Sequence, residues 1–248
     1  VSVAGMSMGT SAGADGADVL YGVESITGSR YSDTLVGDSG DNVIRPLDGD
    51  DTIDGGAGSD TIDYREALSV ANRVLNETNK SAAGYQAGDL IKAPGVVVNL
   101  SGLTDANGFI SVRVADGNET NAAASVDKIK NIENIVGSLY DDILVGDTSA
   151  NTLSGMAGAD TFIGNGGSDT VSYQRAFGGV SVSMSAGADA SAQISPEVAT
   201  ALGVNVSGLA YGVASGGDGN DLLIGISNIR GSEFADTIMG DGQNNVID

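Results

Sequence analysis

The sequence predicts an all-β fold assembled from many short turn-and-strand units. Three observations support this prediction: a nine-residue repeat, glycines that stay in phase with it, and one apolar residue per unit. The repeat has the form Gly-x-x-Gly-x-Asp-x-apolar-x, and its best copy is Gly55-Gly56-Ala57-Gly58-Ser59-Asp60-Thr61-Ile62-Asp63. The glycines permit a tight turn that other residues tolerate poorly, and the apolar residue is expected to point into a core.

Copies of the repeat form three runs. Their first residues are Gly28, Gly37, Pro46 and Gly55, then Gly137, Gly146, Gly155 and Gly164, then Gly231 and Gly240, with isolated copies at Gly13 and Gly216. The chain also contains a longer repeat. Residues 18–68 align without gaps to 127–177 at an offset of 109 (137 − 28). In that alignment Tyr64 falls on Tyr173.

The composition is strongly acidic and excludes several classes of chemistry. The net charge is −22, from 33 acidic and 11 basic side chains, so the compact chain repels itself unless cations neutralise it. Nucleic acid is an unsuitable partner for the same reason. The chain has no Cys and no His, which excludes disulfides, His-ligated zinc and a His-activated serine nucleophile. No apolar run is long enough to span a bilayer.

The nonapeptide resembles the repeat of the RTX family, Gly-Gly-x-Gly-x-Asp-x-apolar-x, which builds a calcium-loaded parallel β-roll. The resemblance implies a right-handed parallel β-roll or β-helix solenoid in which two repeats make one coil. It also implies calcium ions between stacked turns, held by backbone carbonyls and Asp carboxylates. Flexible turns that offer only oxygen ligands suit calcium better than magnesium.

On this basis we expect a single continuous solenoid over 1–248, cut from a longer protein. Its tandem copies are expected at about 13–121, 122–215 and 216–248, with insertions at about 64–126 and 173–215 that carry extra strands and short helices. The strands are predicted within 96–100, 110–114 and 180–184. The helices are predicted over 65–77 and 196–202, the second between Ser195 and Gly203, and both are expected to cover the solenoid. The side chains expected inside are Leu35, Val43, Ile53, Ile62, Leu144, Leu153, Phe162 and Val171.

The expected calcium sites follow the best copies of the motif. Their turn residues are Asp51, Gly55, Gly56, Gly58, Asp60, Gly155, Gly158, Asp160, Gly164 and Asp169. Two further segments match, with Gly13, Asp15 and Asp18 in one and Gly216, Gly217, Asp218, Gly219 and Asp221 in the other. Asp and Gly also build ordinary β-turns, but their phased repetition and the high negative charge favour calcium. A site at Asp127 is disfavoured, because the preceding Ala122-Ala123-Ala124 has no glycine.

Two groups of turns depart from the motif. Asn42, Asn151 and Asn245 replace the Asp, so these turns are either weaker sites or turns that the Asn merely caps. Tyr31, Tyr140 and Phe234 replace the second glycine, and we expect their rings to cover the end of the core. Asp33, Asp142 and Asp236 in those turns are then weaker or partial ligands.

The leading functional hypothesis is a calcium-folded structural module of an extracellular bacterial protein, of adhesin or surface-layer type. The resemblance implies export by type I secretion, with calcium ions and neighbouring domains of the same polypeptide as partners and surface polysaccharide as a further candidate. The alternative is an accessory module of a secreted enzyme whose catalytic domain lies outside this segment. A carbohydrate-acting enzyme is least favoured, because Asp89, Asp105, Asp116 and Glu119 show no spacing that singles out a catalytic pair. We therefore expect no enzymatic activity.

Overall fold

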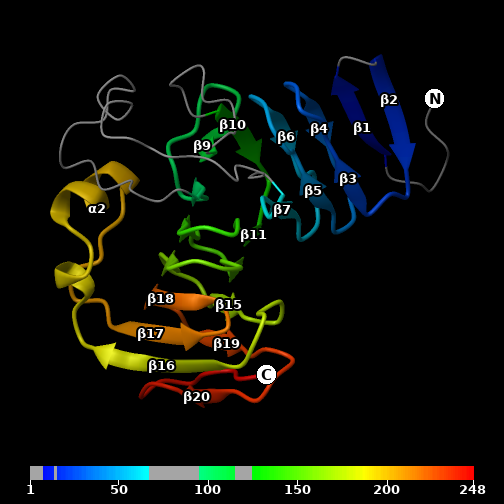
Figure 1. Cartoon of the computed structure of the whole chain (residues 1–248). Coiled ribbons are helices and arrows are strands. Elements are labelled where there is room, and N and C mark those ends of the chain that lie inside the picture. Colours follow the sequence, from blue (N-terminus) through cyan, green and yellow to red (C-terminus); the bar gives the residue numbers. More distant parts are fainter. Residues whose placement is uncertain (1–7, 14–15, 67–94, 115–124) are drawn as a thin grey trace, which may run out of the picture. The chain divides into compact units, whose positions relative to one another are not determined.

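The computed structural model describes all residues except 1–7, 14–15, 67–94 and 115–124. The described chain is mostly β, its strands are largely parallel, and it contains one short α-helix (Figure 1). This confirms the predicted all-β class. Most of the helix predicted over 65–77 lies outside the described residues.

The chain divides into two compact units. The first unit comprises 1–92 and 103–134, and the second comprises 93–102 and 135–248. The strands of the first unit are β1 (Met8–Gly13), β2 (Gly16–Tyr21), β3 (Ser25–Thr27), β4 (Thr34–Val36), β5 (Val43–Arg45), β6 (Thr52–Asp54), β7 (Thr61–Asp63), β9 (Ile110–Val114) and β10 (Ser125–Lys130).

The second unit contains more strands and both helical segments. Its elements are β8 (Val97–Asn99), β11 (Asn134–Val136), β12 (Ile143–Val145), β13 (Thr152–Ser154), β14 (Thr161–Ile163), β15 (Thr170–Ser172), β16 (Val180–Gly187), a 3₁₀ turn (Ala190–Ala192), α2 (Pro196–Leu202), β17 (Tyr211–Gly216), β18 (Gly219–Ile224), β19 (Asn228–Arg230) and β20 (Thr237–Met239). The strands predicted within 96–100, 110–114 and 180–184 are thus confirmed.

Successive nonapeptides supply strands to two alternate sheets. In the first unit the orders are β2-β1-β4-β6-β10-β9 and β3-β5-β7, and in the second they are β8-β12-β14-β18-β17-β16-β20 and β11-β13-β15-β19. Within a run the partners are parallel and two nonapeptides apart, as in Thr34 with Thr52 and Ile143 with Thr161. Within a run each strand is only three residues long, so a six-residue turn separates it from the next strand in sequence.

The middle residue of each three-residue strand points into the core. Because side chains alternate along a strand, its two neighbours face outward. The inward positions were predicted correctly except for Val43, which is only half-buried, whereas Ile44 is fully buried. Ile44 is the eighth residue of the nonapeptide that starts at Gly37, as Ile53 and Ile62 are in theirs. The buried side chains are Leu35, Ile44, Ile53, Ile62, Leu144, Leu153, Phe162 and Val171.

Antiparallel hairpins interrupt the parallel pattern outside the nonapeptide runs. The antiparallel pairs are β1–β2, β1–β4, β9–β10, β16–β17 and β17–β18. The insertions therefore join the sheets partly as hairpins and do not simply continue the parallel stacking.

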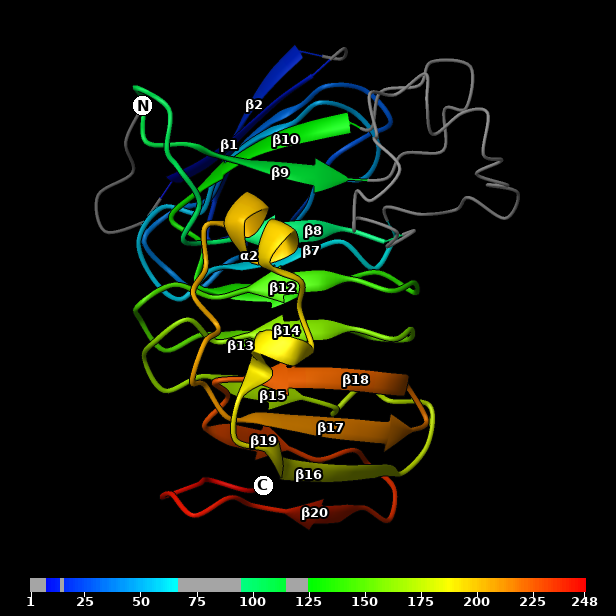
Figure 2. The same ribbon diagram turned by 90° about the vertical axis from the view of Figure 1, so that its left-hand side faces the viewer.

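The predicted helix over 196–202 is confirmed together with its caps. Ser195 Oγ accepts a hydrogen bond from Val198 N–H at 3.4 Å, Pro196 takes the first helical position, and Gly203 ends the helix with a left-handed backbone (φ 68°). Figure 2 looks onto the face that this segment covers. On this face Val198 and Leu202, together with residues of the 3₁₀ turn and the loops, pack against the outward side chains of three strands. These side chains are Ile143 and Val145 of β12, Ile163 of β14 and Ile224 of β18.

The apolar cover explains why the outer positions of these strands are Ile and Val. The corresponding positions of β6 in the first unit are Thr52 and Asp54. No helix within the described part of the chain has the length and apolarity needed to cross a membrane.

The rings of Tyr31 and Phe234 do not cover the core, so the expectation was wrong for these two residues. Their side chains are 68% and 55% exposed, and Tyr140 is half-buried. In both exposed cases the serine two residues earlier accepts a hydrogen bond from the backbone N–H of the aromatic residue. The turn is thus held by backbone and serine groups, and the ring points outward.

A pair of Phe→Ala substitutions in the second unit tests this placement. Phe162 is fully buried in β14, so Phe162→Ala should lower the free energy of unfolding by about 3–5 kcal/mol. Phe234→Ala removes an exposed ring and should change it by less than about 0.5 kcal/mol. Denaturant titration of both variants measures the difference, and a similar loss for both would show that the ring of Phe234 is packed.

Candidate metal sites in the nonapeptide turns

In four turns the sixth residue is an Asp that ties its turn to the one two nonapeptides earlier. Asp160 Oδ1 accepts a hydrogen bond from the backbone N–H of Asp142 at 2.8 Å, and Asp60 Oδ1 accepts one from Asn42 at 2.8 Å. Equivalent bonds join Asp51 to Asp33 at 2.7 Å and Asp169 to Asn151 at 2.9 Å. The carboxylate therefore lies between stacked turns, where it is shielded from water.

The second oxygen of these four carboxylates has no hydrogen-bond partner although it is buried. The atoms are the Oδ2 oxygens of Asp51, Asp60, Asp160 and Asp169. We call their turns, 46–51, 55–60, 155–160 and 164–169, the open turns. Buried polar atoms are nearly always satisfied, so an orphaned carboxylate oxygen indicates that an ion or water belongs beside it.

In the remaining turns a side-chain oxygen of the sixth residue, Oδ2 of Asp or the single Oδ1 of Asn, is satisfied by the turn itself. The backbone N–H of the second turn residue donates to it, as Ser138 does to Asp142 at 2.6 Å and Asp147 does to Asn151 at 2.8 Å. We call these six turns the closed turns. Their sixth residues are Asp33, Asn42, Asp142, Asn151, Asp236 and Asn245.

The backbone of the second turn residue separates the two classes. In the open turns this residue is left-handed, with φ of 73° at Leu47, 105° at Gly56, 77° at Met156 and 64° at Asn165. It donates no hydrogen bond to the Asp, so the oxygen stays orphaned. The second residues of the closed turns, such as Ser138 and Asp147, do not have positive φ.

Three of the four open turns begin with a glycine that makes room for the orphaned oxygen, whereas the turn 46–51 begins with Pro46. A Cβ atom placed on Gly155 would collide with Asp160 Oδ2, and Gly55 and Gly164 stand in the same relation to Asp60 and Asp169. The fourth residue is also glycine, with φ of 125° at Gly58 and 137° at Gly158. A side chain there would strike the backbone of the neighbouring turn, so both glycines of the motif have a steric reason.

Burial destabilises the ionised form of the open-turn carboxylates. Loss of hydration raises the pKa of Asp51 to about 8, of Asp60 to about 6, of Asp160 to about 9 and of Asp169 to about 7, and nearby carboxylates raise it further. Asp63 shows the contrast. It is equally buried but is paired with Arg45 at 3.0 Å and with Arg65, and the Arg65 guanidinium holds its pKa below the usual range despite burial.

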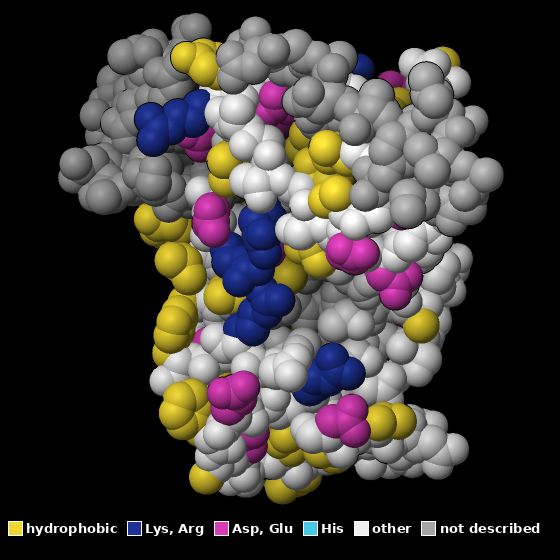
Figure 3. Space-filling view, turned by 90° about the vertical axis from the view of Figure 1, so that its right-hand side faces the viewer, with side chains coloured by type: hydrophobic (Ala, Val, Ile, Leu, Met, Phe, Trp, Pro, Cys, Tyr) yellow, Lys and Arg dark blue, Asp and Glu magenta, His cyan; other side chains and the backbone are white. Residues whose placement is uncertain are grey.

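Many other acidic and basic side chains lie on the surface, as Figure 3 shows for one face, although Asp127, Asp142 and Asp221 are also buried. The buried open-turn carboxylates form no ion pair with Lys or Arg among the described residues, whereas Asp63 does. A bound cation would supply the missing positive charge.

The ligands around the open turns are oxygen atoms only. Within the described ranges no group of three or more acidic or His side chains converges on one point, so backbone carbonyls would have to complete a coordination shell. The stacked turns bring such carbonyls close, since Ala57 N–H bonds to the Asp38 carbonyl at 3.0 Å and Gly58 lies against the Gly40 carbonyl. Carboxylate and carbonyl oxygens in a glycine-rich turn fit calcium, which accepts six to eight such ligands at loose geometry.

The two isolated copies of the motif form hairpin turns. Gly13 pairs with Gly16 between β1 and β2, and the side chains of Asp15 and Asp18 lie outside the described residues. Gly216 pairs with Gly219 between β17 and β18, with Gly217 and Asp218 as the two-residue loop. The sequence predicted calcium turns in both segments. Calcium binding there stays a prediction, although the local geometry differs from that of the open turns.

Sequence reasoning missed three residues that hydrogen-bond to the acids of these rows, one to a backbone N–H and two to a carboxylate. Glu133 Oε2 accepts the backbone N–H of Asp60 at 2.7 Å, so it continues the same row of acids. Tyr64 and Tyr173 donate their hydroxyls to Asp127 Oδ2 at 3.0 Å and Asp221 Oδ2 at 2.9 Å. The signal for the tyrosines was present, because they fall on each other in the 109-residue repeat.

The comparisons agree with this geometry. The model of the RTX calcium-binding nonapeptide repeat (4 copies) matches 27–62, 136–171 and 226–248, which include all four open turns. These parts of the chain are RTX calcium-binding nonapeptide repeats. Such repeats imply a calcium-binding module of a secreted bacterial protein, typically one exported by type I secretion. No curated protein matched the chain.

Two glycine substitutions test the steric role of the first turn residue. Gly155→Ala places a methyl group on the orphaned oxygen of Asp160, so the calcium concentration at half-folding should rise at least about tenfold, equivalent to ~1.4 kcal/mol. Gly242→Ala is the matched control, because nothing lies within 4 Å of its added Cβ. Calcium titrations followed by circular dichroism measure both, and equal midpoints would contradict the steric account.

Proposed function

We propose that this chain is a calcium-folded structural module of an extracellular bacterial protein, of adhesin or surface-layer type. The observation that carries the proposal is the set of four buried, orphaned carboxylate oxygens at Asp51, Asp60, Asp160 and Asp169. They belong to turns that the repeat model matches. Calcium bound beside them would neutralise carboxylates that burial otherwise disfavours as anions.

Binding and folding are coupled in this proposal. The ligands of one open turn meet those of the neighbouring turn only when the strands are stacked, so the site is absent from the unfolded chain. Calcium therefore stabilises only the folded state, and its binding free energy contributes directly to folding. The net charge of −22 opposes compaction without cations.

The same coupling suits export by type I secretion. At low cytosolic calcium the chain would stay unfolded and could pass through a secretion channel, and it would fold outside the cell where calcium is abundant. The parallel pairing two nonapeptides apart supports coils of a right-handed β-roll in each unit. That the units form one continuous solenoid belongs to the same proposal.

An accessory module of a secreted enzyme is the alternative, and the sequence of the full-length protein would distinguish the two. We propose that the segment itself has no catalytic activity. Of its candidate carboxylates Asp105 is held by its own loop and lies 3.7 Å from Lys128, while the other three lie outside the described residues.

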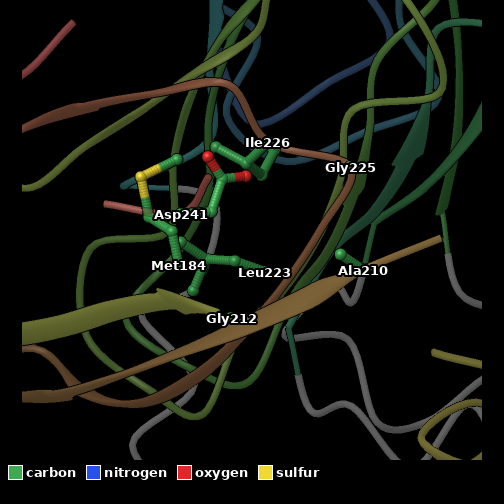
Figure 4. A pocket seen from close by; sticks show the side chains of 7 residues that line it. All are labelled: Met184, Ala210, Gly212, Leu223, Gly225, Ile226 and Asp241. Atoms are coloured by element: carbon green, nitrogen blue, oxygen red, sulfur yellow. The ribbon is translucent and has the colours of Figure 1, made fainter. Parts of the chain in front are cut away.

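Polysaccharide binding gains no support from the best-formed cavity of the second unit. This cavity is about 70 Å³ in volume, enough for a few water molecules. Figure 4 shows it between Met184, Ile226 and Asp241, with Gly212 and Leu223 from the hairpin of β17 and β18.

Calcium removal tests the proposed function. In excess chelator the chain should show little β signal by circular dichroism, and added calcium should restore it cooperatively at ~10⁻⁴–10⁻³ M, as for extracellular modules. Magnesium at the same concentration is the control and should restore less, because it holds its waters and demands stricter geometry. A full β spectrum in chelator would refute the proposal.

A further inference from the structure

In the second unit, three acids occupy successive positions in one column. Val96 N–H bonds to Asp142 at 2.7 Å, Asp142 N–H to Asp160 at 2.8 Å, and Asp160 N–H to Asp221 at 3.0 Å. All three carboxyl groups are buried. Each uses Oδ1 for the neighbouring backbone, so the three acids differ in what satisfies Oδ2.

The Oδ2 atoms of this column have three different environments. The Oδ2 atom of Asp142 accepts the N–H of Ser138 within the closed turn, and the Oδ2 atom of Asp160 has no partner. In Asp221 it accepts the hydroxyl of Tyr173 at 2.9 Å. Only the middle acid is therefore left with an unsatisfied oxygen.

The first unit repeats this arrangement with different residues. Asp33 Oδ2 accepts Ser29 N–H at 2.6 Å, Asp51 Oδ2 has no partner, and Asp127 Oδ2 accepts the Tyr64 hydroxyl at 3.0 Å. Asp33 N–H bonds to Asp51, and Asp51 N–H bonds to Asp127. Two independent copies thus have the same order of a closed, an open and a tyrosine-bound acid.

We propose that Tyr64 and Tyr173 take the place of a cation at the end of each column, so that Asp127 and Asp221 bind no calcium. The inference rests on the proposed calcium binding at the open turns. It assigns the column one calcium position per unit, beside Asp51 and beside Asp160. The proposal also means that Asp221, which the sequence offered as a calcium ligand, instead holds the backbone of Asp160 and the hydroxyl of Tyr173.

The position of the tyrosines in the fold gives the proposal a physical reason. Tyr64 directly follows β7 and Tyr173 directly follows β15, where each nonapeptide run ends. Asp127 and Asp221 lie on β10 and β18, which pair antiparallel with β9 and β17. Among the described residues no further nonapeptide turn stacks there to supply carbonyl ligands. The phenol instead satisfies the oxygen with one neutral donor and fills the space, since Tyr64 and Tyr173 are 0% and 3% exposed.

Matched Asp→Asn substitutions in one column provide the main test. Asp160→Asn and Asp221→Asn both keep an Oδ1 acceptor for the neighbouring N–H and remove one charge. Titration calorimetry of the chain with calcium should show one ion fewer for Asp160→Asn and an unchanged number for Asp221→Asn. Loss of an ion from Asp221→Asn would overturn the proposal. Asp51→Asn and Asp127→Asn repeat the comparison in the first unit, in case Asp160→Asn does not fold.

Removal of the phenol hydroxyl tests the tyrosine directly. Tyr173→Phe keeps the ring but leaves Asp221 Oδ2 buried and unsatisfied. Its denaturation midpoint in saturating calcium should fall, while the number of ions and the slope of the midpoint against log calcium concentration stay as in the wild type. An unchanged midpoint, or a changed ion number, would contradict the role assigned to the hydroxyl.

The two levels of the account fail in distinguishable ways. If the wild-type chain takes up no calcium in the calorimeter, the proposed function is wrong. If the wild type binds calcium but the Asp160→Asn and Asp221→Asn variants lose the same number of ions, only the role of the tyrosines is wrong.

Discussion

Stacking of the turns depends on the hydrogen bond from a backbone N–H to the carboxylate oxygen of an Asp that is the sixth turn residue two nonapeptides later. Asp60 and Asp160 each make this bond at 2.8 Å. Formation of the bond draws a carboxylate out of water, and in three of the four open turns the first residue is a glycine that leaves room for the second oxygen, as at Gly155. The second oxygen is then buried, and its environment decides whether the turn is complete without a metal ion.

The chain satisfies that second oxygen in three ways. A closed turn provides the N–H of its own second residue, as Ser138 does for Asp142. Where the sixth residue is Asn, as at Asn42 and Asn151, that N–H goes to its single side-chain oxygen and no second oxygen is left. The two run ends provide a tyrosine hydroxyl. The four open turns provide nothing from the protein. Closed turns and tyrosines can therefore hold the stack in place around positions that require a cation.

The strands, the core and the open turns follow from local pattern and were predictable. The nine-residue period fixes which residue lies inside, and the only error, Val43 in place of Ile44, was a shift of one residue within a strand. The helix 196–202 was predictable because Ser195, Pro196 and Gly203 are local signals. Asp51, Asp60, Asp160 and Asp169 were singled out by their turns, and within the described residues they are the acids with orphaned oxygens.

The remaining features depend on contacts between residues that are distant in sequence. The outward rings of Tyr31 and Phe234 follow from serine bonds within the turn, which the glycine motif did not reveal. Tyr64 reaches an acid 63 residues away and Tyr173 one 48 residues away, separations that no short motif encodes. The antiparallel hairpins at Gly13 and Gly216 have the same spacing of glycine and Asp as the turns of the nonapeptide runs. The spacing alone therefore could not distinguish the two kinds of turn.

The most direct test of the central claim is a crystal structure of the chain grown in calcium, with the ions located by their anomalous scattering. The account predicts calcium beside the Oδ2 atoms of Asp51, Asp60, Asp160 and Asp169, and none beside Asp127 or Asp221. Calcium beside the closed turns or the tyrosine-bound acids, with the four open turns empty, would contradict it.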